Sequence, residues 1–164
     1  MADPRVAVTT TGLLAFDNAQ IRYYPTNKHT TVAYGLLLAS YKEARLYIAE
    51  ASARTGDLAT ARQLINQMHT EANIPAFDPG GTTSQDSVTA QVIEERRREL
   101  FTEGGHRLND QLRFRGTKWN IPFKGEAGSI FPTGVDATGL PYGTTTCFPL
   151  PTVEVIGNPN ISHP

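Results

Sequence analysis

The stretch from residue 94 to residue 115 constrains the fold most, because it combines dense charge with a helical period and a glycine stop. It reads EERRRELFTEGGHRLNDQLRFR. Four apolar residues in and before it recur two turns apart: Val92, Ile93, Leu100 and Phe101. This spacing, with charges between, indicates an amphipathic helix. Gly104 and Gly105 follow, where left-handed backbone can end the helix, and we expect a second helix to begin at His106.

The charges of this stretch predict structural ion pairs. Glu94 and Arg98 are four residues apart in the favourable order, a pair worth ~0.2–0.5 kcal/mol. Arg107 and Asp110 are three apart on the next helix, so they can pair locally. A clamp for an anion or carboxylate is the alternative, but alternating charges on a helix usually form a solvated face or an ion-pair network.

Two further helices are predicted between residues 40 and 70. Ser40 and Glu43 have the spacing of a capping box, which predicts a helix from Tyr41 to about Thr55. Its apolar stripe consists of Ala44, Tyr47, Ile48 and Ala51. Gly56-Asp57 would end this helix and cap the next, which runs to about residue 70. The apolar stripe of that second helix consists of Ala61, Leu64, Ile65 and Met68. The pair forms a tight antiparallel hairpin that resembles a tetratricopeptide unit.

The sequence as a whole predicts a mostly α-helical fold. We expect one domain over residues 1–164, with extended arms or short strands in 1–39 and two tetratricopeptide-like hairpins in 40–115. Residues 116–164 form a long coil-rich tail packed on the helices. The loop at 72–85 separates the hairpins, and Asp86 or Ser87 would cap the helix that follows it. The 14 glycines and 11 prolines agree with a loop-rich chain.

Composition and motifs exclude several classes of function. A net charge of −1 with mixed signs does not favour nucleic acid. No apolar run is long enough to span a membrane, and the start MADPRVAVTT does not resemble a signal peptide or supply a lipid-anchor cysteine. The four histidines lack metal-ligand spacing, and we found no nucleophile, phosphate or dinucleotide motif. We therefore expect no enzyme activity, metal or cofactor. Cys147 is the only cysteine and reads as a small buried apolar residue.

Two distant motifs carry a family resemblance. The first is the succession Glu95-Arg96, Glu99-Leu100, Glu103-Gly104, Arg107, Asp110 and Leu112-Arg113. The second is Phe148-Pro149-Leu150-Pro151, Glu154 and Asn158-Pro159-Asn160. Together they resemble the C-terminal portion of the SusD/RagB family of outer-membrane nutrient-binding proteins. Gly105 and Gln111 depart from the family pattern as inserted residues. The sequence leaves open whether the chain is a fragment or a short relative.

The resemblance implies a non-catalytic function. Such proteins lie on the cell-surface side of the outer membrane, bind oligosaccharides or other nutrients, and cover a TonB-dependent transporter. Within this chain, Trp119 and Tyr142 are the candidate ligand-binding residues, because flat aromatic faces stack on sugar rings. Each could instead simply pack.

A structural or self-assembling protein-interaction module is the alternative function. Two helical pairs are fewer than a solenoid normally needs, so an apolar face would seek a partner. The partner could be another copy of the chain or a missing N-terminal half. The candidate assembly arms carry Val6, Val8 and Ile21, in strand-forming runs that could pair between copies.

Overall fold

The computed structural model describes residues 3–9, 28–29, 31, 33, 35, 37–80, 83–129, 133–135, 139–143 and 150–158. The chain divides into two compact units, Met1–Ile121 and Pro122–Pro164. The first contains the 3-10 turn η1 (Pro4–Val6) and four helices: α1 (Tyr41–Thr55), α2 (Leu58–Glu71), α3 (Gln85–Glu99) and α4 (His106–Arg113). The second contains α5 (Thr152–Gly157). The fold is mostly helical, and the described ranges contain no named strand.

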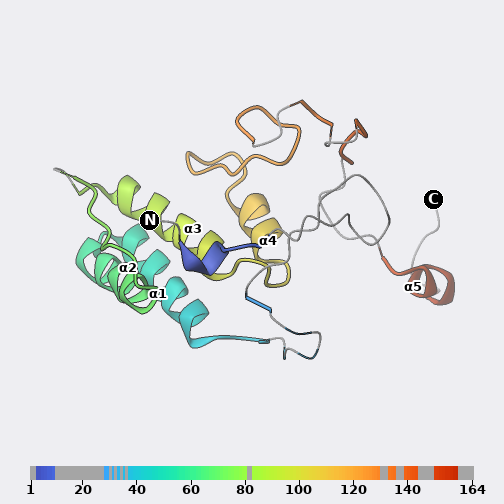
Figure 1. The fold of residues 1–164 in the computed structure, drawn as a ribbon. Helices are drawn as coiled ribbons and strands as arrows, with labels where there is room; N and C mark the ends of the chain where they lie inside the picture. The colour runs from blue at the N-terminus through green and yellow to red at the C-terminus, as the bar shows by residue number, and fades with distance from the viewer. Residues whose placement is uncertain are drawn as a thin grey trace. The chain divides into compact units, whose positions relative to one another are not determined.

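Three helices form the core of the first unit. The helix α1 packs against both α2 and α3, and α2 also contacts α3 (Figure 1). Small residues of α1 lie at the centre of this packing. The main cluster of buried residues is Ala49, Ala53, Ala61, Ile65, Val88 and Val92. A second cluster is Leu46, Met68 and Leu100. The alanines let the helices approach closely, as the similarity to a tetratricopeptide unit implies.

Capping residues fix the ends of the first two helices close to the predicted positions. The Ser40 hydroxyl accepts a hydrogen bond from the Glu43 amide at 3.0 Å. Gly56 ends α1 in the left-handed conformation with φ +91°, which glycine adopts without strain. The Asp57 carboxylate then accepts from the Thr60 amide at the start of α2. Because each cap is a local interaction, the expected boundaries of this hairpin are confirmed almost to the residue.

The cap of α3 differs from our expectation. Ser84, not Asp86 or Ser87, is the N-cap, and its hydroxyl accepts from the Ser87 amide at 3.0 Å. The Ser84 amide in turn donates to the Ser87 hydroxyl at 3.1 Å, so the two serines form a capping box. The cap prediction was wrong by two or three residues because several residues that can cap a helix follow one another here, and local sequence does not choose among them.

The apolar stripe expected on α1 lies on the wrong face. Ala44 and Ala51 are exposed, and Tyr47 and Ile48 are each 53% exposed. The buried apolar face instead carries Leu46, Ala49 and Ala53. This helix has apolar residues on both sides, so periodicity alone could not select the side that α2 and α3 cover.

The second pair of helices is less regular than the first. The principal partners of α3 are α1, α2 and η1 rather than α4. Helix α4 begins after Gly105, which is in the left-handed conformation with φ +80°. Phe114, directly after the helix, is fully buried. The core is therefore formed by α1, α2 and α3, and α4 is joined to it through side chains.

The start of the chain is a turn rather than an extended strand. Pro4–Val6 form the 3-10 turn η1, capped by the Asp3 side chain, where we expected the beginning of an extended arm. The turn contacts α3. Proline at the first position of the turn and a capping aspartate before it explain this local structure.

The second unit is held by turns. Val135 and Pro141 form an antiparallel bridge, and the Tyr142 amide donates to the Gly134 carbonyl at 3.0 Å. A Cβ on Gly125, which has φ +88°, would lie 3.2 Å from the Gly134 backbone, so this close approach requires glycine. Our expectation that residues 116–164 pack on the helices within one domain stays a prediction.

Candidate functional site

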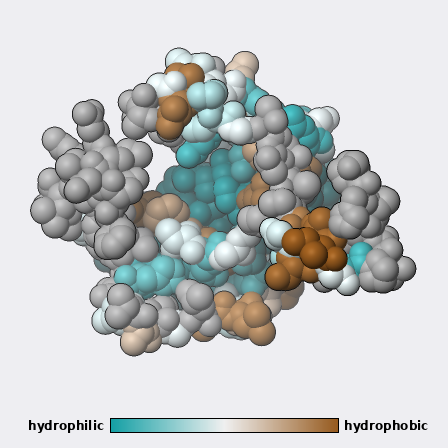
Figure 2. Space-filling model, turned by 90° about the vertical axis from the view of Figure 1, so that its right-hand side faces the viewer, coloured by the Kyte–Doolittle hydropathy of each residue, from teal (hydrophilic) through white to brown (hydrophobic). Residues whose placement is uncertain are grey.

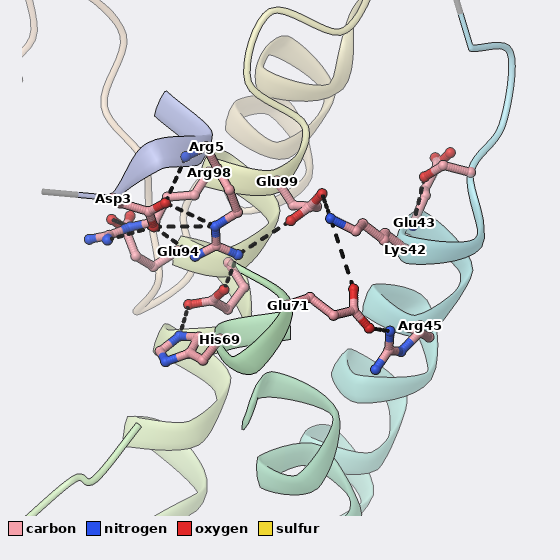
Figure 3. A network of polar contacts seen from close by, with 12 residues as sticks. Asp3, Arg5, Lys42, Glu43, Arg45, His69, Glu71, Glu94, Arg98 and Glu99 are labelled. Atoms are coloured by element: carbon pink, nitrogen blue, oxygen red, sulfur yellow. Dashed lines mark hydrogen bonds and ion pairs between the residues drawn. The ribbon is translucent and has the colours of Figure 1, made fainter. Parts of the chain in front are cut away.

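A network of charged side chains lies on α3 and ties four segments together (Figure 3). Its centre is the Glu95 carboxylate, which is fully buried. Arg5 of η1 lies 2.7 Å from one Glu95 oxygen, and Nε2 of His69 on α2 lies 2.7 Å from the other. Nδ1 of His69 donates to the Pro75 carbonyl at 2.6 Å, and the Gln91 amide also donates to Glu95. Glu95 therefore joins the N-terminal turn, α2, α3 and the loop after α2.

Asp3 anchors the N-terminal turn to the same helix. Its carboxylate accepts from Arg5 at 2.7 Å and from Arg98 at 3.2 Å. The hydrogen bonds from the Arg5 side chain hold the pKa of Asp3 well below its usual range, against the opposing effect of burial. The ionised carboxylate is therefore the form that this contact stabilises.

His69 and Glu95 have the geometry of a histidine–carboxylate pair, but they are closed to substrate. Their side chains are 9% and 0% exposed. Both ring nitrogens of His69 are engaged, one by Glu95 and one by Pro75. A general base needs to reach the proton that it removes, and here both ring nitrogens of a nearly buried side chain are already hydrogen-bonded within the protein. The arrangement is structural.

The ion pairs expected from the sequence are present in part. Glu94 lies 2.7 Å from Arg98 and 2.6 Å from Arg97 on the exposed side of α3. Asp110 lies 3.1 Å from Arg96, and both side chains are buried. Arg113 adds a contact to Asp110 at 2.8 Å.

The pairing of Arg107 with Asp110 is the exception. In the described part of the chain, no ion pair joins these two residues, although both lie on α4. Asp110 contacts Arg96 from α3 instead, so the pair that forms is tertiary rather than local. The spacing along α4 was correct, but it could not reveal a guanidinium arriving from another helix.

Trp119, a candidate ligand-binding residue, is half-buried at the end of the first unit. The Arg54 guanidinium lies 5.7 Å from the centre of its ring, and the Lys118 ammonium lies 4.8 Å from it. Both distances are within the range of cation–π attraction. The indole thus has cationic hydrogen-bond donors beside it.

Tyr142, the second candidate, belongs to the second unit and has separate surroundings. Its ring lies 5.5 Å from the Lys124 ammonium and packs beside Gly125. It is also half-buried. Each aromatic candidate is therefore partly exposed and next to a cation, and each is considered within its own unit.

The candidate assembly residues lie at the start of the chain. Val6 is half-buried in η1, and Val8 is 47% exposed. Ile21 lies outside the described residues, as does Cys147. Other apolar side chains also contribute to the surface, where Figure 2 shows brown apolar patches separated by polar teal and white areas.

A groove between α1 and α2 was not predicted from the sequence. It is shallow, with a volume of about 650 Å³. Its walls are Tyr41 and Arg45 from α1 and a polar row on α2 composed of Gln63, Asn66, Gln67, Thr70 and Glu71. Polar residues at three- and four-residue spacing along α2 are the signal that could have indicated this face.

Two features are absent from the described residues. They contain no group of three or more His, Cys, Asp or Glu side chains that could hold a metal ion. None of the helices in the described ranges has the length and apolar character needed to cross a membrane.

The family model of the SusD family matches residues 41–162, about three quarters of the chain. The chain therefore belongs to the SusD family, as its motifs predicted. This is a family of non-catalytic, glycan-binding proteins that partner TonB-dependent transporters at the surface of the outer membrane. A comparison with curated proteins found no match, and neither did a comparison with solved structures.

Proposed function

We propose that this chain takes part in nutrient uptake by binding an oligosaccharide, without catalysis, on the cell-surface side of the outer membrane, beside a TonB-dependent transporter. The observation that carries the proposal is the family match over residues 41–162, which includes α1 to α5.

The aromatic candidates supply the chemistry of the proposed binding. The Trp119 indole offers apolar surface for a pyranose ring, and Arg54 and Lys118 supply donors for sugar hydroxyls beside it. Tyr142 and Lys124 offer the same combination in the second unit. An aromatic face with nearby donors provides both stacking energy and orientation.

A panel of neutral hexasaccharides tests the proposal. Binding of cellohexaose, maltohexaose and xylohexaose is measured by isothermal titration calorimetry for the wild type and for Trp119→Ala and Tyr142→Ala. We expect at least one sugar to bind the wild type, and each alanine variant to bind it about tenfold more weakly with an unchanged melting temperature. Trp119→Phe, which keeps an aromatic ring, is the matched control. If no hexasaccharide binds the wild type, the glycan-binding function is wrong.

Protein interaction is the second candidate function, and one observation favours it. Tyr41, Tyr47 and Ile48 expose more than half of their surface along α1, which leaves apolar area for a partner. Native mass spectrometry of the protein isolated from its source distinguishes the candidates. Attachment to a transporter supports nutrient uptake, whereas a particle of many identical chains supports self-assembly. A monomer that carries no partner counts against both interactions.

A further inference from the structure

The groove between α1 and α2 combines an exposed aromatic ring with uncharged polar groups. Tyr41, at the first position of α1, is 74% exposed. Facing the groove from α2 are Gln63, Gln67 and Thr70, which are also exposed. The two helices lie side by side (Figure 1), so the ring and the polar row line one surface. Neither the family motifs nor the sequence candidates include these residues.

One buried arginine holds both walls of the groove in position. The Arg45 side chain is 6% exposed, and its guanidinium lies 5.0 Å from the centre of the Tyr41 ring. The same guanidinium donates to Glu71 at 2.6 Å and to the Gln67 side-chain oxygen. Burying a charge is costly, and here it orders an aromatic ring and an amide that are themselves exposed. Groups ordered before a ligand arrives lose less entropy on binding.

These hydrogen bonds also determine which atoms the groove offers. The Gln67 side-chain oxygen accepts from Arg45, so its amide nitrogen is left to donate elsewhere. The Asn66 side-chain oxygen accepts from the Phe77 amide at 2.7 Å, so the Asn66 side-chain nitrogen is likewise the group left to donate. The Thr70 hydroxyl donates to the Asn66 carbonyl at 2.9 Å, so its oxygen can still accept. The assignment is forced, because guanidinium and backbone N–H groups can only donate.

The charges beside the groove compensate one another. Arg45 lies 2.6 Å from Glu71, and Lys42 lies 2.8 Å from Glu99 and 3.9 Å from Glu71. Both cations beside the groove are therefore paired with carboxylates, and Glu99 also pairs with Arg5 at 3.4 Å (Figure 3). A strongly charged ligand would gain little binding energy from charges that are already paired. A ligand with many neutral oxygen atoms would match the amide donors and the hydroxyl acceptor.

We infer that the α1–α2 groove is a carbohydrate-binding site, in which Tyr41 stacks on a neutral sugar ring and the amides of Gln63, Asn66 and Gln67 bind its hydroxyl oxygens. The inference rests on the proposed glycan-binding function and adds a site to it. Flat aromatic surface beside a few fixed polar groups is the composition that such sites need. A docked protein helix would seek apolar anchors, and apart from Tyr41 this groove is lined by polar side chains.

The test follows the side-chain amides directly. The full chain, labelled with ¹⁵N, is titrated with cellohexaose, maltohexaose, xylohexaose and, as a charged comparator, hexagalacturonate. The expected result is that one neutral hexasaccharide shifts the side-chain NH₂ signals of Gln63, Asn66 and Gln67, while hexagalacturonate leaves them in place. Tyr41→Ala should weaken this binding at least about tenfold, and Tyr41→Phe should retain it.

The matched control is Tyr47→Ala. Tyr47 is an exposed tyrosine of the same helix that does not line this groove, so its loss should leave the affinity unchanged. If a saccharide binds the wild type, still binds Tyr41→Ala and shifts none of the three amide signals, the groove is not the binding site, although the protein binds glycans. Equal weakening by Tyr41→Ala and Tyr47→Ala would also overturn the groove as the binding site. Absence of any saccharide binding to the wild type would overturn the proposed function and the groove together.

Discussion

The two sides of α3 carry similar charges in different surroundings, and the difference determines what each charge contributes. On the inner side, Glu95 is 0% exposed and holds Arg5 and His69. On the outer side, Glu94 is 32% exposed and holds Arg97 and Arg98. The two glutamates are neighbours in the sequence. Water screens and competes with the outer pairs, whereas removal of the inner carboxylate takes one charge out of a buried network in which Arg5 keeps Asp3 and Glu99 and His69 keeps the Pro75 carbonyl.

The largest effect is expected from Glu95→Gln. The substitution keeps the shape of the side chain but removes the charge that faces Arg5 and His69. We expect a loss of about 3–5 kcal/mol in the free energy of unfolding, because the fully buried carboxylate that contacts both Arg5 and His69 is lost from the network. Urea unfolding followed by circular dichroism measures it. A loss as small as that of Glu94→Gln would contradict the comparison.

An intermediate effect is expected at Asp3, which links η1 to the outer side of α3 through Arg98. Asp3→Asn should cost about 1.5–3 kcal/mol, the range for hydrogen bonds to charged groups. Hydrogen exchange of the Val6 and Ala7 amides, which bond to the turn, would report whether the turn has loosened. Unchanged protection of both amides would show that Asp3 does not anchor it.

The pH dependence of stability tests the same contact of Asp3 with Arg5 and Arg98. The pKa of Asp3 is lowered in the folded protein, chiefly by hydrogen bonds from Arg5, so the unfolded chain binds the proton more tightly. The contribution of Asp3 is therefore complete above its unfolded pKa of about 3.9 and is lost as the pH falls toward the folded value. We expect the stability difference between wild type and Asp3→Asn to shrink below about pH 4. A difference independent of pH would exclude this origin.

The smallest effect is expected from Glu94→Gln. Exposed ion pairs typically contribute ~0.2–1 kcal/mol, and we expect a loss in that range. Because salt screens exposed charges, 1 M NaCl should remove most of the difference between wild type and Glu94→Gln while leaving that of Glu95→Gln. Salt-independent losses for both variants would mean that the outer pairs are shielded as the inner ones are.

The predictions that succeeded rest on local interactions or on ordered motifs. Ser40, Gly56 and Asp57 end or begin helices through contacts a few residues away, so the first hairpin could be placed accurately. The apolar stripe of α2 is confirmed in Ala61, Ile65 and Met68, which are fully buried. The family followed from two motifs far apart in the chain, and the match over residues 41–162 confirms it.

The predictions that failed depended on which surfaces meet. Tyr47 and Ile48 belong to a regular apolar stripe, yet they are exposed because α2 and α3 cover the other side of α1. Asp110 stands three residues from Arg107, yet its contacts are with Arg96 and Arg113. Trp119 and Tyr142 remain predictions as ligand-binding residues.

The sequence by itself determined the helices α1 to α4, most of their ends and the family, because hydrogen bonds of caps and the period of a helix act over short distances. It did not predict α5, which lies in the segment expected to be a coil-rich tail. Tertiary structure alone decided which face of α1 is buried, which arginine meets Asp110, and that Arg45 orders Tyr41 and Gln67 across a groove. Burial and long-range ion pairs depend on segments up to 95 residues apart, as Asp3 and Arg98 are, and no local pattern specifies which of them meet.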